Sequence, residues 1–369
     1  MTRKLVIHIG AQKCASSSLQ SSLGSLAVAS AGKLDFCFLD GKKLLNLKIS
    51  LLKGSGEGDW SYVDSVFDAF ISPQAVISQE MLGNNPFLVG SIAKRALKRF
   101  NFDEVVIAGY TRRQSDYQVS AFNQWFFRDQ KVVQADINVC LENQLPWSKF
   151  SSLERNLLAL ILVGKDRSWH ADYSGLMDNV QTLAGAVRVV SNHIPTRKQP
   201  YGLLENFLDI TDLALEIDDV GQFNSRENIA FNPLVVHAMS HYYSELGSRQ
   251  SCFPGPHEGN KWISNICRRL NETNLEFNFE EIFPSSLITA LLDCLDWRTY
   301  SDNANYCNLM SVSPSFFSPP QREVSFDSAD VLESARYFAE ARQRRDIEKF
   351  QRDVENAFMK AVHDEIANC

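Results

Sequence analysis

The chain has 369 residues, of which 44% are hydrophobic and 22% are charged. This composition is typical of a globular protein and excludes a disordered chain. The formal net charge of -7 argues against a broad nucleic-acid-binding surface. No run of residues approaches the roughly 18 apolar residues of a membrane span, and the apolar run 5–9 is too short for the core of a signal peptide. We therefore expect a cytoplasmic protein without a membrane anchor.

The first part of the chain alternates between short runs rich in Val, Ile and Leu and segments with helical spacing of apolar residues. The short runs predict buried strands at 4–10, 75–79, 104–110 and 187–190. The helical segments between them are 17–29, 60–71, 91–100 and 115–127. This alternation predicts an α/β fold in which helices cover both faces of a parallel sheet.

The remainder of the chain has a mostly helical pattern. Helices are predicted at 152–163, 171–184, 200–209, 230–245, 259–271, 285–296 and 328–366. Prolines and serines over 310–325 predict a loop before the last helix. We found no internal repeat, so we expect one domain over residues 1–369, with an α/β core at 1–130 and a mainly helical extension at 131–369.

The eight cysteines lie at wide, irregular spacings, and none belongs to a CxxC pair. This pattern argues against a zinc ribbon and against a dense disulfide framework. We expect reduced thiols, although an even number of cysteines leaves disulfides open. Cys14 stands at a predicted helix start, where the positive end of the helix dipole is expected to lower the pKa of a thiol.

A loop of small residues joins the first predicted strand to the first helix, with the sequence GAQKCASSS from Gly10 to Ser18. Backbone amides of such a loop and of the helix start converge on one point, where they stabilise an anion. Lys13 adds a positive charge, and Ser16 and Ser17 add hydroxyl donors. The lysine comes too early for a Walker A motif. The alternative interpretation is an ordinary helix start beside a solvated lysine.

A second candidate anion site follows the predicted strand 104–110. Arg112 comes directly after that strand, and Ser120 stands eight residues further on, in the next helix. A guanidinium group binds a phosphate with two parallel hydrogen bonds, and a serine hydroxyl adds a third donor. For Arg112 alone, a surface ion pair is the commoner role.

Together, and in this order, the two segments resemble the nucleotide-binding motifs of sulfotransferases that use 3'-phosphoadenylyl sulfate (PAPS). The first is similar to the family's 5'-phosphosulfate loop, Pro-Lys-Thr/Ser-Gly-Thr-Thr, at Lys13, Ser16 and Ser17. It departs from that loop at Gln12, where proline is usual, and at Ala15, where glycine is usual. A left-handed conformation at Ala15 would destabilise the loop by about 1 kcal/mol.

Arg112 and Ser120 match the same family's 3'-phosphate signature, Arg-x7-Ser, and the residues between them resemble the bacterial carbohydrate-directed branch. The resemblance implies a P-loop type of fold, PAPS as sulfuryl donor, adenosine 3',5'-bisphosphate as product, no metal, and a carbohydrate or glycolipid acceptor. It also implies that the donor is bound by residues of both segments: Lys13, Cys14, Ala15, Ser16, Ser17, Ser18, Arg112 and Ser120.

Sulfuryl transfer requires a general base for the acceptor proton and a cation near the leaving phosphate. Lys13 is the candidate cation. Glu80 directly follows the predicted strand 75–79, at the end of a parallel strand where ligands bind, and bacterial relatives carry a similar glutamate there. His8 lies within the first predicted strand, where a core histidine is the better interpretation. The alternative for Glu80 is a helix start.

Two other functions fit the same segments: a P-loop kinase, which would depend on Mg²⁺, and a nucleotide-binding protein without catalysis, which the alanine at position 15 favours. His237 and His241 have the spacing of metal ligands on a helix but lack the glutamate of an HExxH motif, so a structural or surface role is expected. The arginine-rich run 341–345 is interpreted as a solvated helix face.

Overall fold

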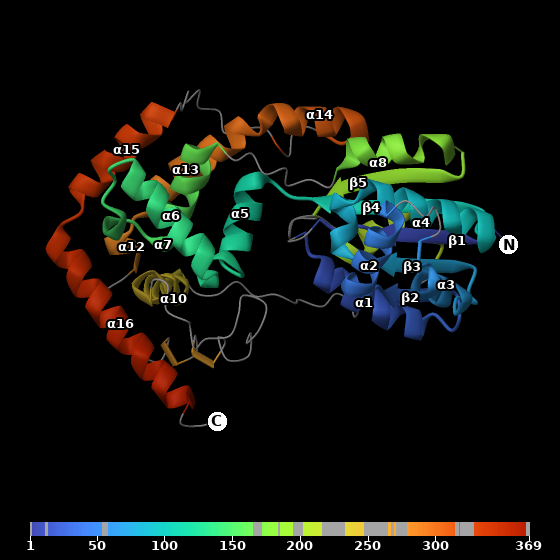
Figure 1. Cartoon of the computed structure of the whole chain (residues 1–369), viewed down its shortest axis with the longest axis horizontal. Coiled ribbons are helices and arrows are strands. Elements are labelled where there is room, and N and C mark those ends of the chain that lie inside the picture. The colour runs from blue at the N-terminus through green and yellow to red at the C-terminus, as the bar shows by residue number, and fades with distance from the viewer. Residues whose placement is uncertain are drawn as a thin grey trace. The chain divides into compact units, whose positions relative to one another are not determined.

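The computed structural model describes most of the chain (Figure 1). The described residues are 2–11, 14–53, 58–164, 172–183, 185–194, 202–215, 233–246, 265–266, 269–270, 279–313, 317 and 328–366. They form two compact units, each of which is built from several segments of the chain. Unit 1 comprises residues 1–113, 168–229 and 301–316, and unit 2 comprises residues 114–167, 230–300 and 317–369. The expectation of a single domain stays a prediction.

Unit 1 contains a five-stranded sheet with the strand order β2-β3-β1-β4-β5. All four pairs of neighbouring strands are parallel. The strands are β1 (Lys4–His8), β2 (Leu34–Phe38), β3 (Gln74–Ser78), β4 (Glu104–Thr111) and β5 (Val187–His193). The α/β fold with a parallel sheet, predicted from alternating patterns, is therefore confirmed.

Helices cover both faces of this sheet (Figure 1). One face carries α1 (Ser16–Ala29) and α9 (Leu203–Thr211), which contact each other and share a core with β1, β3 and β4. The other face carries α4 (Pro86–Arg99) and α8 (Tyr173–Val180), which pack together. Unit 1 also contains α2 (Gly41–Leu52), α3 (Ser61–Asp68), all of α14 (Tyr300–Met310) but its first residue, and the 3₁₀ helices η1 (Glu80–Asn84) and η4 (Gln181–Leu183).

The central strands are buried on both sides because the side chains in their middle are apolar. Residues 5–7 of β1, 75–77 of β3 and 105–108 of β4 have no exposed surface. Strand β2 was missed because its sequence, LDFCF, reads as neither a continuous apolar run nor a clear alternation, as befits an edge strand that is half-buried. Helix α2 was missed with it.

Unit 2 is helical. Its helices are α5 (Gln114–Phe122), α6 (Gln130–Glu142), α7 (Ser152–Val163), α10 (Pro233–Leu246), α12 (Phe279–Ile282), α13 (Ser285–Arg298), α15 (Ser328–Ala341) and α16 (Arg344–Ile366), with short 3₁₀ helices η2 (Phe126–Arg128) and η3 (Trp147–Lys149). Helix α7 begins at a complete capping box between Ser151 and Glu154 and ends at Gly164 in the left-handed conformation, which explains its sharp limits. The expected helix 259–271 lies mostly outside the described residues.

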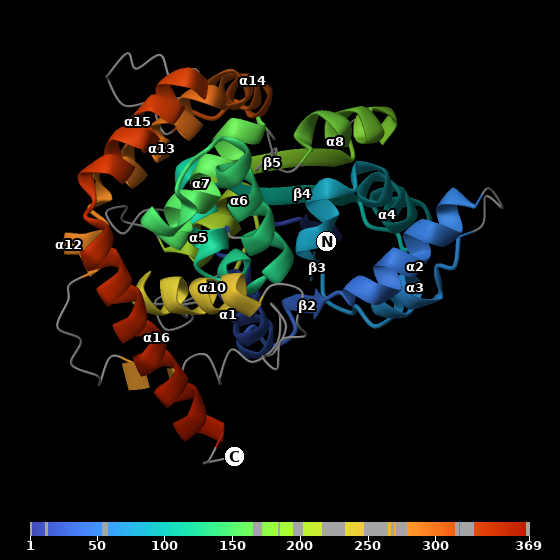
Figure 2. The same ribbon diagram turned by 60° about the vertical axis from the view of Figure 1, so that its left-hand side comes forward.

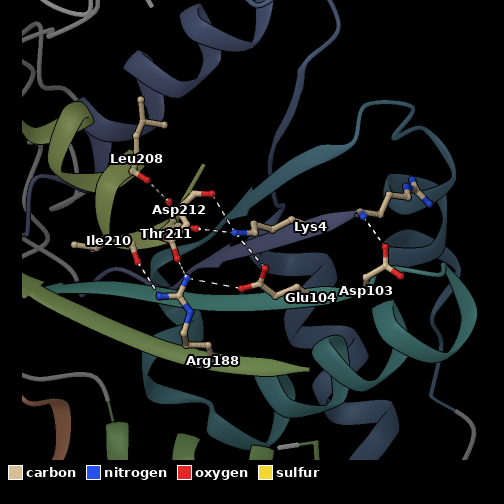
Figure 3. Close-up of polar contacts among 9 residues, drawn as sticks. Lys4, Asp103, Glu104, Arg188, Leu208, Ile210, Thr211 and Asp212 are labelled. Atoms are coloured by element: carbon tan, nitrogen blue, oxygen red, sulfur yellow. Dashed lines mark hydrogen bonds and ion pairs between the residues drawn. The ribbon is translucent and has the colours of Figure 1, made fainter. Parts of the chain in front are cut away.

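A network of charges ties the amino-terminal ends of three strands to the end of α9 (Figure 3). Glu104 lies 3.1 Å from the Lys4 ammonium and 3.7 Å from the Arg188 guanidinium. Lys4 donates to the carbonyls of Thr211 and Asp212, at 3.3 and 3.0 Å. Cations at the carboxyl end of a helix interact favourably with its dipole, so this network fixes α9 on the sheet.

Among the residues that the structure describes, no helix combines the length and the apolar character needed to cross a membrane.

Candidate functional site

The strand order places the two predicted anion-binding segments beside each other. From β1 the chain crosses to β2 and β3 on one side of the sheet, whereas from β4 it continues to β5 on the other side. In open parallel sheets, ligands bind at the carboxyl ends of the two strands between which the direction of the connections reverses. Here those strands are β1, which leads into the small-residue loop, and β4, which leads into Arg112.

Hydrogen bonds hold the start of the small-residue loop against the end of β4. The Ala11 amide donates to the Tyr110 carbonyl at 3.2 Å, and the Tyr110 amide donates to the Gly10 carbonyl at 2.7 Å. Arg112 is only two residues beyond Tyr110. A Cβ added to Gly109 would lie 2.8 Å from the Gly10 carbonyl oxygen and 2.6 Å from the Tyr173 hydroxyl, so this approach depends on a glycine in β4.

Within the loop, several polar groups stabilise the loop itself. The Cys14 amide and the Ser16 hydroxyl both donate to the Ala11 carbonyl, at 3.3 and 3.1 Å. Helix α1 begins at Ser16 without a side-chain cap, and the amides of a first helical turn have no partner within the helix. The side chains of Ser17 and Ser18 are half-buried. Lys13 and Gln12 lie outside the described residues.

Ala15 adopts the left-handed conformation, with φ 58° and ψ 21°. This is the conformation that glycine adopts without strain and that destabilises an alanine by about 1–2 kcal/mol. The replacement Ala15→Gly is therefore expected to raise the free energy of unfolding by about 0.5–1 kcal/mol, after the greater freedom of glycine in the unfolded chain is subtracted. Denaturant unfolding measures the difference.

The matched control is Ala27→Gly, which changes the same residue within α1. It is expected to lower the free energy of unfolding by about 1 kcal/mol, because glycine disfavours a helix interior. Equal destabilisation by both replacements would contradict the left-handed conformation of Ala15.

Cys14 corrects one expectation from the sequence. Its side chain is buried in the core shared by α1 and the sheet, and burial raises the pKa of its thiol to about 12, although the positive charge of Arg112 acts in the opposite direction. The helix start therefore does not lower this pKa, because removal from water outweighs the dipole. The negative charge of Glu80 also raises the pKa of Cys14, so Arg112 and Glu80 act on the same loop position.

Glu80 lies at the end of the sheet that the sequence predicted, two residues beyond Ser78, the last residue of β3. It is the first residue of η1 and is half-buried. Gln79 holds this turn, since its side chain accepts a hydrogen bond from the Met81 amide at 3.4 Å and donates to the Leu39 carbonyl at 2.6 Å. The structure thus brings the loop, Glu80 and Arg112 to one edge of the sheet.

Ser120 belongs to a different unit from Arg112. It is half-buried in α5, which begins unit 2, whereas Arg112 and Arg113 end a segment of unit 1. At the start of α5, the amide and hydroxyl of Ser115 both donate to the Asp296 carboxylate, at 3.0 and 2.8 Å. The pairing of Arg112 with Ser120 on one phosphate stays a prediction.

His8 is a core histidine, as expected. It has no exposed surface, its Nδ1 lies 2.7 Å from the Ser78 hydroxyl oxygen, and its ring meets Phe207 edge-on. Gln20 of α1 donates to the same Ser78 oxygen at 3.0 Å. These contacts join the ends of β1 and β3 to α1, directly beneath the loop and Glu80.

Burial lowers the pKa of His8 from 6.5 to about 4. As the pH falls, the unfolded chain therefore takes up a proton at His8 at a higher pH than the folded chain does. The stability that neutral His8 contributes is complete above pH 6.5 and is lost as the pH falls to about 4. The total loss is about 3 kcal/mol. The expected result is that His8→Asn, whose amide can donate to Ser78 or accept from it, loses less stability than the wild type between pH 6.5 and 4.5. Parallel losses measured by denaturant unfolding would contradict a buried neutral His8.

A cluster of hydroxyl groups beside the loop was missed from the sequence. Ser191 of β5 lies 2.8 Å from the Tyr173 hydroxyl and 2.7 Å from the Tyr306 hydroxyl, and Thr111 donates to Tyr306 at 3.2 Å. Burial raises the pKa of Tyr306 to about 12, and the two hydrogen bonds oppose that shift in part. These tyrosines come from α8 and α14, far from β4 in sequence, so no local pattern could join them.

His193 was also missed. It ends β5, and its Nδ1 lies 3.3 Å from the Thr111 hydroxyl oxygen. The strand predicted at 187–190 stops three residues before this histidine, so the sequence did not place it at a strand end.

His237 lies in the core of unit 2, and the half-buried His241 stacks its ring on that of His237, with the two ring centroids 6.3 Å apart. The His237 ring is buried among Phe279, Phe283 and Phe350, and its Nδ1 accepts a hydrogen bond from the Ser152 amide at 3.2 Å. In the described part of the chain, no three His, Cys, Asp or Glu residues are grouped so that they could hold a metal. These contacts support the structural role.

The sequence matches no family model and no curated protein, and the fold matches no solved structure. A functional assignment therefore depends on the residues of the candidate site: the loop after β1, Glu80 after β3 and Arg112 after β4.

Proposed function

We propose that this chain is a sulfotransferase that moves a sulfuryl group from PAPS to an acceptor hydroxyl. One observation carries the proposal. The two segments that resemble the donor-binding motifs follow β1 and β4, which are neighbours in the sheet and flank the reversal of its connections. A donor with a phosphosulfate at one end and a 3'-phosphate at the other requires two anion sites within one nucleotide length.

The loop residues and the start of α1 would bind the phosphosulfate. Small side chains at Ala15, Ser16 and Ser17 allow an anion to approach the backbone, and the helix dipole favours negative charge there. Because the Ser16 hydroxyl donates to the Ala11 carbonyl, we assign its contribution to the backbone amide. Arg112 would bind the 3'-phosphate with two parallel hydrogen bonds.

Glu80 would act as the general base. It removes the proton from the acceptor hydroxyl as the acceptor oxygen forms a bond to sulfur, while the bond between sulfur and the phosphate oxygen breaks. The electron pair of the broken bond stays on the phosphate, and Lys13 stabilises the charge that develops there. The charges of Glu80 and Arg112 both affect the pKa of Cys14, and this supports a common site for the loop, Glu80 and Arg112.

The acceptor class is proposed from the resemblance alone: a carbohydrate or glycolipid hydroxyl. No metal enters the proposed reaction, because Lys13 and Arg112 supply the positive charge. The P-loop type of fold is part of the same proposal, and the strand order supports it.

The test is a turnover assay in which purified protein is incubated with ³⁵S-labelled PAPS and a panel of sugars and glycolipids, with EDTA or with Mg²⁺. The expected result is transfer of label to at least one acceptor in the presence of EDTA. Phosphate transfer from ATP that requires Mg²⁺ would instead identify a kinase. Tight binding of adenosine 3',5'-bisphosphate without turnover of any acceptor would identify a nucleotide-binding protein.

A further inference from the structure

Helix α2 (Gly41–Leu52) lies at the surface of unit 1 (Figure 2). Its side chains form an exposed apolar stripe. Its inner side is formed by Leu44 and Leu47, which are buried. On the outer side, Leu45, Ile49 and Leu52 are 46%, 42% and 65% exposed. Because these three residues are spaced four and three apart, they lie on one line along the helix.

Lysines border this stripe. At 100° per residue, Lys48 lies on one side of the line formed by Leu45, Ile49 and Leu52, and Lys42 and Lys53 lie on the other. The segment 41–53 has four lysines and no acidic residue, although the whole chain has a net charge of -7. The preceding Asp40 caps the helix, since its carboxylate accepts hydrogen bonds from the amides of Lys42 and Lys43.

We propose that the outer face of α2 binds the surface of an anionic membrane. A helix with exposed leucines and isoleucine between lysines is suited to lie in the plane of the lipid headgroups, with its apolar stripe among the acyl chains and its ammonium groups at the phosphates. An apolar stripe that binds another protein would more commonly have few lysines at its border, because lysine is depleted at protein interfaces. The charge pattern therefore selects the lipid surface.

The membrane-binding face begins beside the candidate site. A Cβ added to Gly41 would lie 3.5 Å from both the side-chain Nε2 of Gln79 and the sulfur of Met81, the residues on either side of Glu80. Lys48 donates to the Asn85 side chain, just beyond η1. Binding at α2 would therefore bring a lipid-borne acceptor hydroxyl near Glu80, a consequence that rests on the function proposed above. The membrane binding itself does not rest on that function.

The experiment is vesicle flotation of the full chain without any donor or acceptor. Vesicles of phosphatidylcholine are compared with vesicles that contain phosphatidylserine, at low and high salt. We expect binding only to the anionic vesicles and weaker binding at high salt. The double variant Lys42→Glu/Lys53→Glu and the double variant Leu45→Ser/Ile49→Ser should each lower the partition coefficient at least tenfold.

Two controls match these changes elsewhere in the chain. Lys94→Glu/Lys98→Glu makes the same change of charge on exposed positions of α4, and Leu141→Ser removes a leucine of α6 that is 55% exposed. Both should bind anionic vesicles within about twofold of the wild type, since neither touches α2. Circular dichroism melting confirms that the α2 variants are folded.

Three results would overturn the proposal: no flotation of the wild type with anionic vesicles, equal losses in the α2 and control variants, or equal binding to neutral vesicles. A wild-type dimer that Leu45→Ser/Ile49→Ser converts to a monomer, without any vesicle binding, would show that a second copy of the chain covers the stripe. Failure of sulfuryl transfer would leave the flotation result unchanged, so the two proposals are tested separately.

Discussion

The replacement Glu80→Gln is expected to lower the rate of sulfuryl transfer by about 10²–10⁴-fold, the usual contribution of a general base. Binding of adenosine 3',5'-bisphosphate should change by no more than about twofold, because the nucleotide lacks the acceptor proton that Glu80 removes. Glutamine preserves the size and shape of the side chain but removes its negative charge and its basicity, because an amide nitrogen replaces one carboxylate oxygen. Steady-state turnover of labelled PAPS and calorimetric titration of the nucleotide give the two quantities.

Glu104→Gln is the matched control. It changes the same residue type in the same sheet, at the opposite end from the candidate site, where Glu104 pairs with Lys4 and Arg188. Its turnover should equal that of the wild type. Near-normal turnover by Glu80→Gln would show that the base is another residue, and His193 at the end of β5 would be the next to replace.

The second large effect is expected in unit 2, where Arg342→Ala should lower the free energy of unfolding by about 3–5 kcal/mol. Arg342 donates to both carboxylate oxygens of Glu154, at 2.8 and 2.6 Å, and Glu154 has no exposed surface. Loss of the guanidinium would leave a buried carboxylate without its cation, at the capping box that starts α7. Denaturant unfolding followed by tryptophan fluorescence measures the change.

Two further variants isolate this pair. Arg344→Ala removes an arginine that is 84% exposed and pairs with Glu348 on the surface of α16, so it should cost less than about 0.5 kcal/mol. The double variant Arg342→Met/Glu154→Gln should recover at least half of the loss, because it removes the unpaired charge and keeps a side chain that can complete the capping box. Equal effects of Arg342→Ala and Arg344→Ala would contradict the buried pair.

The position of Arg342 contradicts the prediction for the arginine-rich run. The run 341–345 was interpreted as a solvated face of one long helix over 328–366, but α15 ends at Ala341 and α16 begins at Arg344. The chain turns there, which carries Arg342 inward to Glu154 while Arg344 stays on the surface. Which of several adjacent arginines becomes buried depends on a carboxylate almost 190 residues earlier, and periodicity holds no information about such a partner.

The central strands could be predicted because burial on both faces requires a run of apolar residues, and β1, β3 and β4 have such runs. The half-buried edge strand β2 lacks one. In the site, Glu80 and Arg112 could be identified because the carboxyl end of a parallel strand can be located from the strand itself. The direction of the Cys14 pKa was predicted wrongly, since the dipole of a helix start is local but the burial that outweighs it arises from packing of α1 on the sheet.

The hydroxyl cluster around Ser191 was missed for a related reason. Its tyrosines come from α8 and α14, at positions 173 and 306, and each is an ordinary aromatic residue in its own helix. Only the folded sheet brings them to β5. Such convergence depends on contacts between distant segments, whereas a motif such as the loop after β1 is contained in a few consecutive residues.

The measurement that tests the central claim most directly is calorimetric titration of adenosine 3',5'-bisphosphate into the wild type, Arg112→Ala and Arg188→Ala. Arg188 lies on the same sheet at its opposite end. We predict micromolar binding by the wild type and by Arg188→Ala, and at least about 30-fold weaker binding by Arg112→Ala, the loss expected for a charged hydrogen-bonding partner of a phosphate. Absence of binding by the wild type, or equal binding by all three proteins, would contradict a nucleotide site between the ends of β1 and β4.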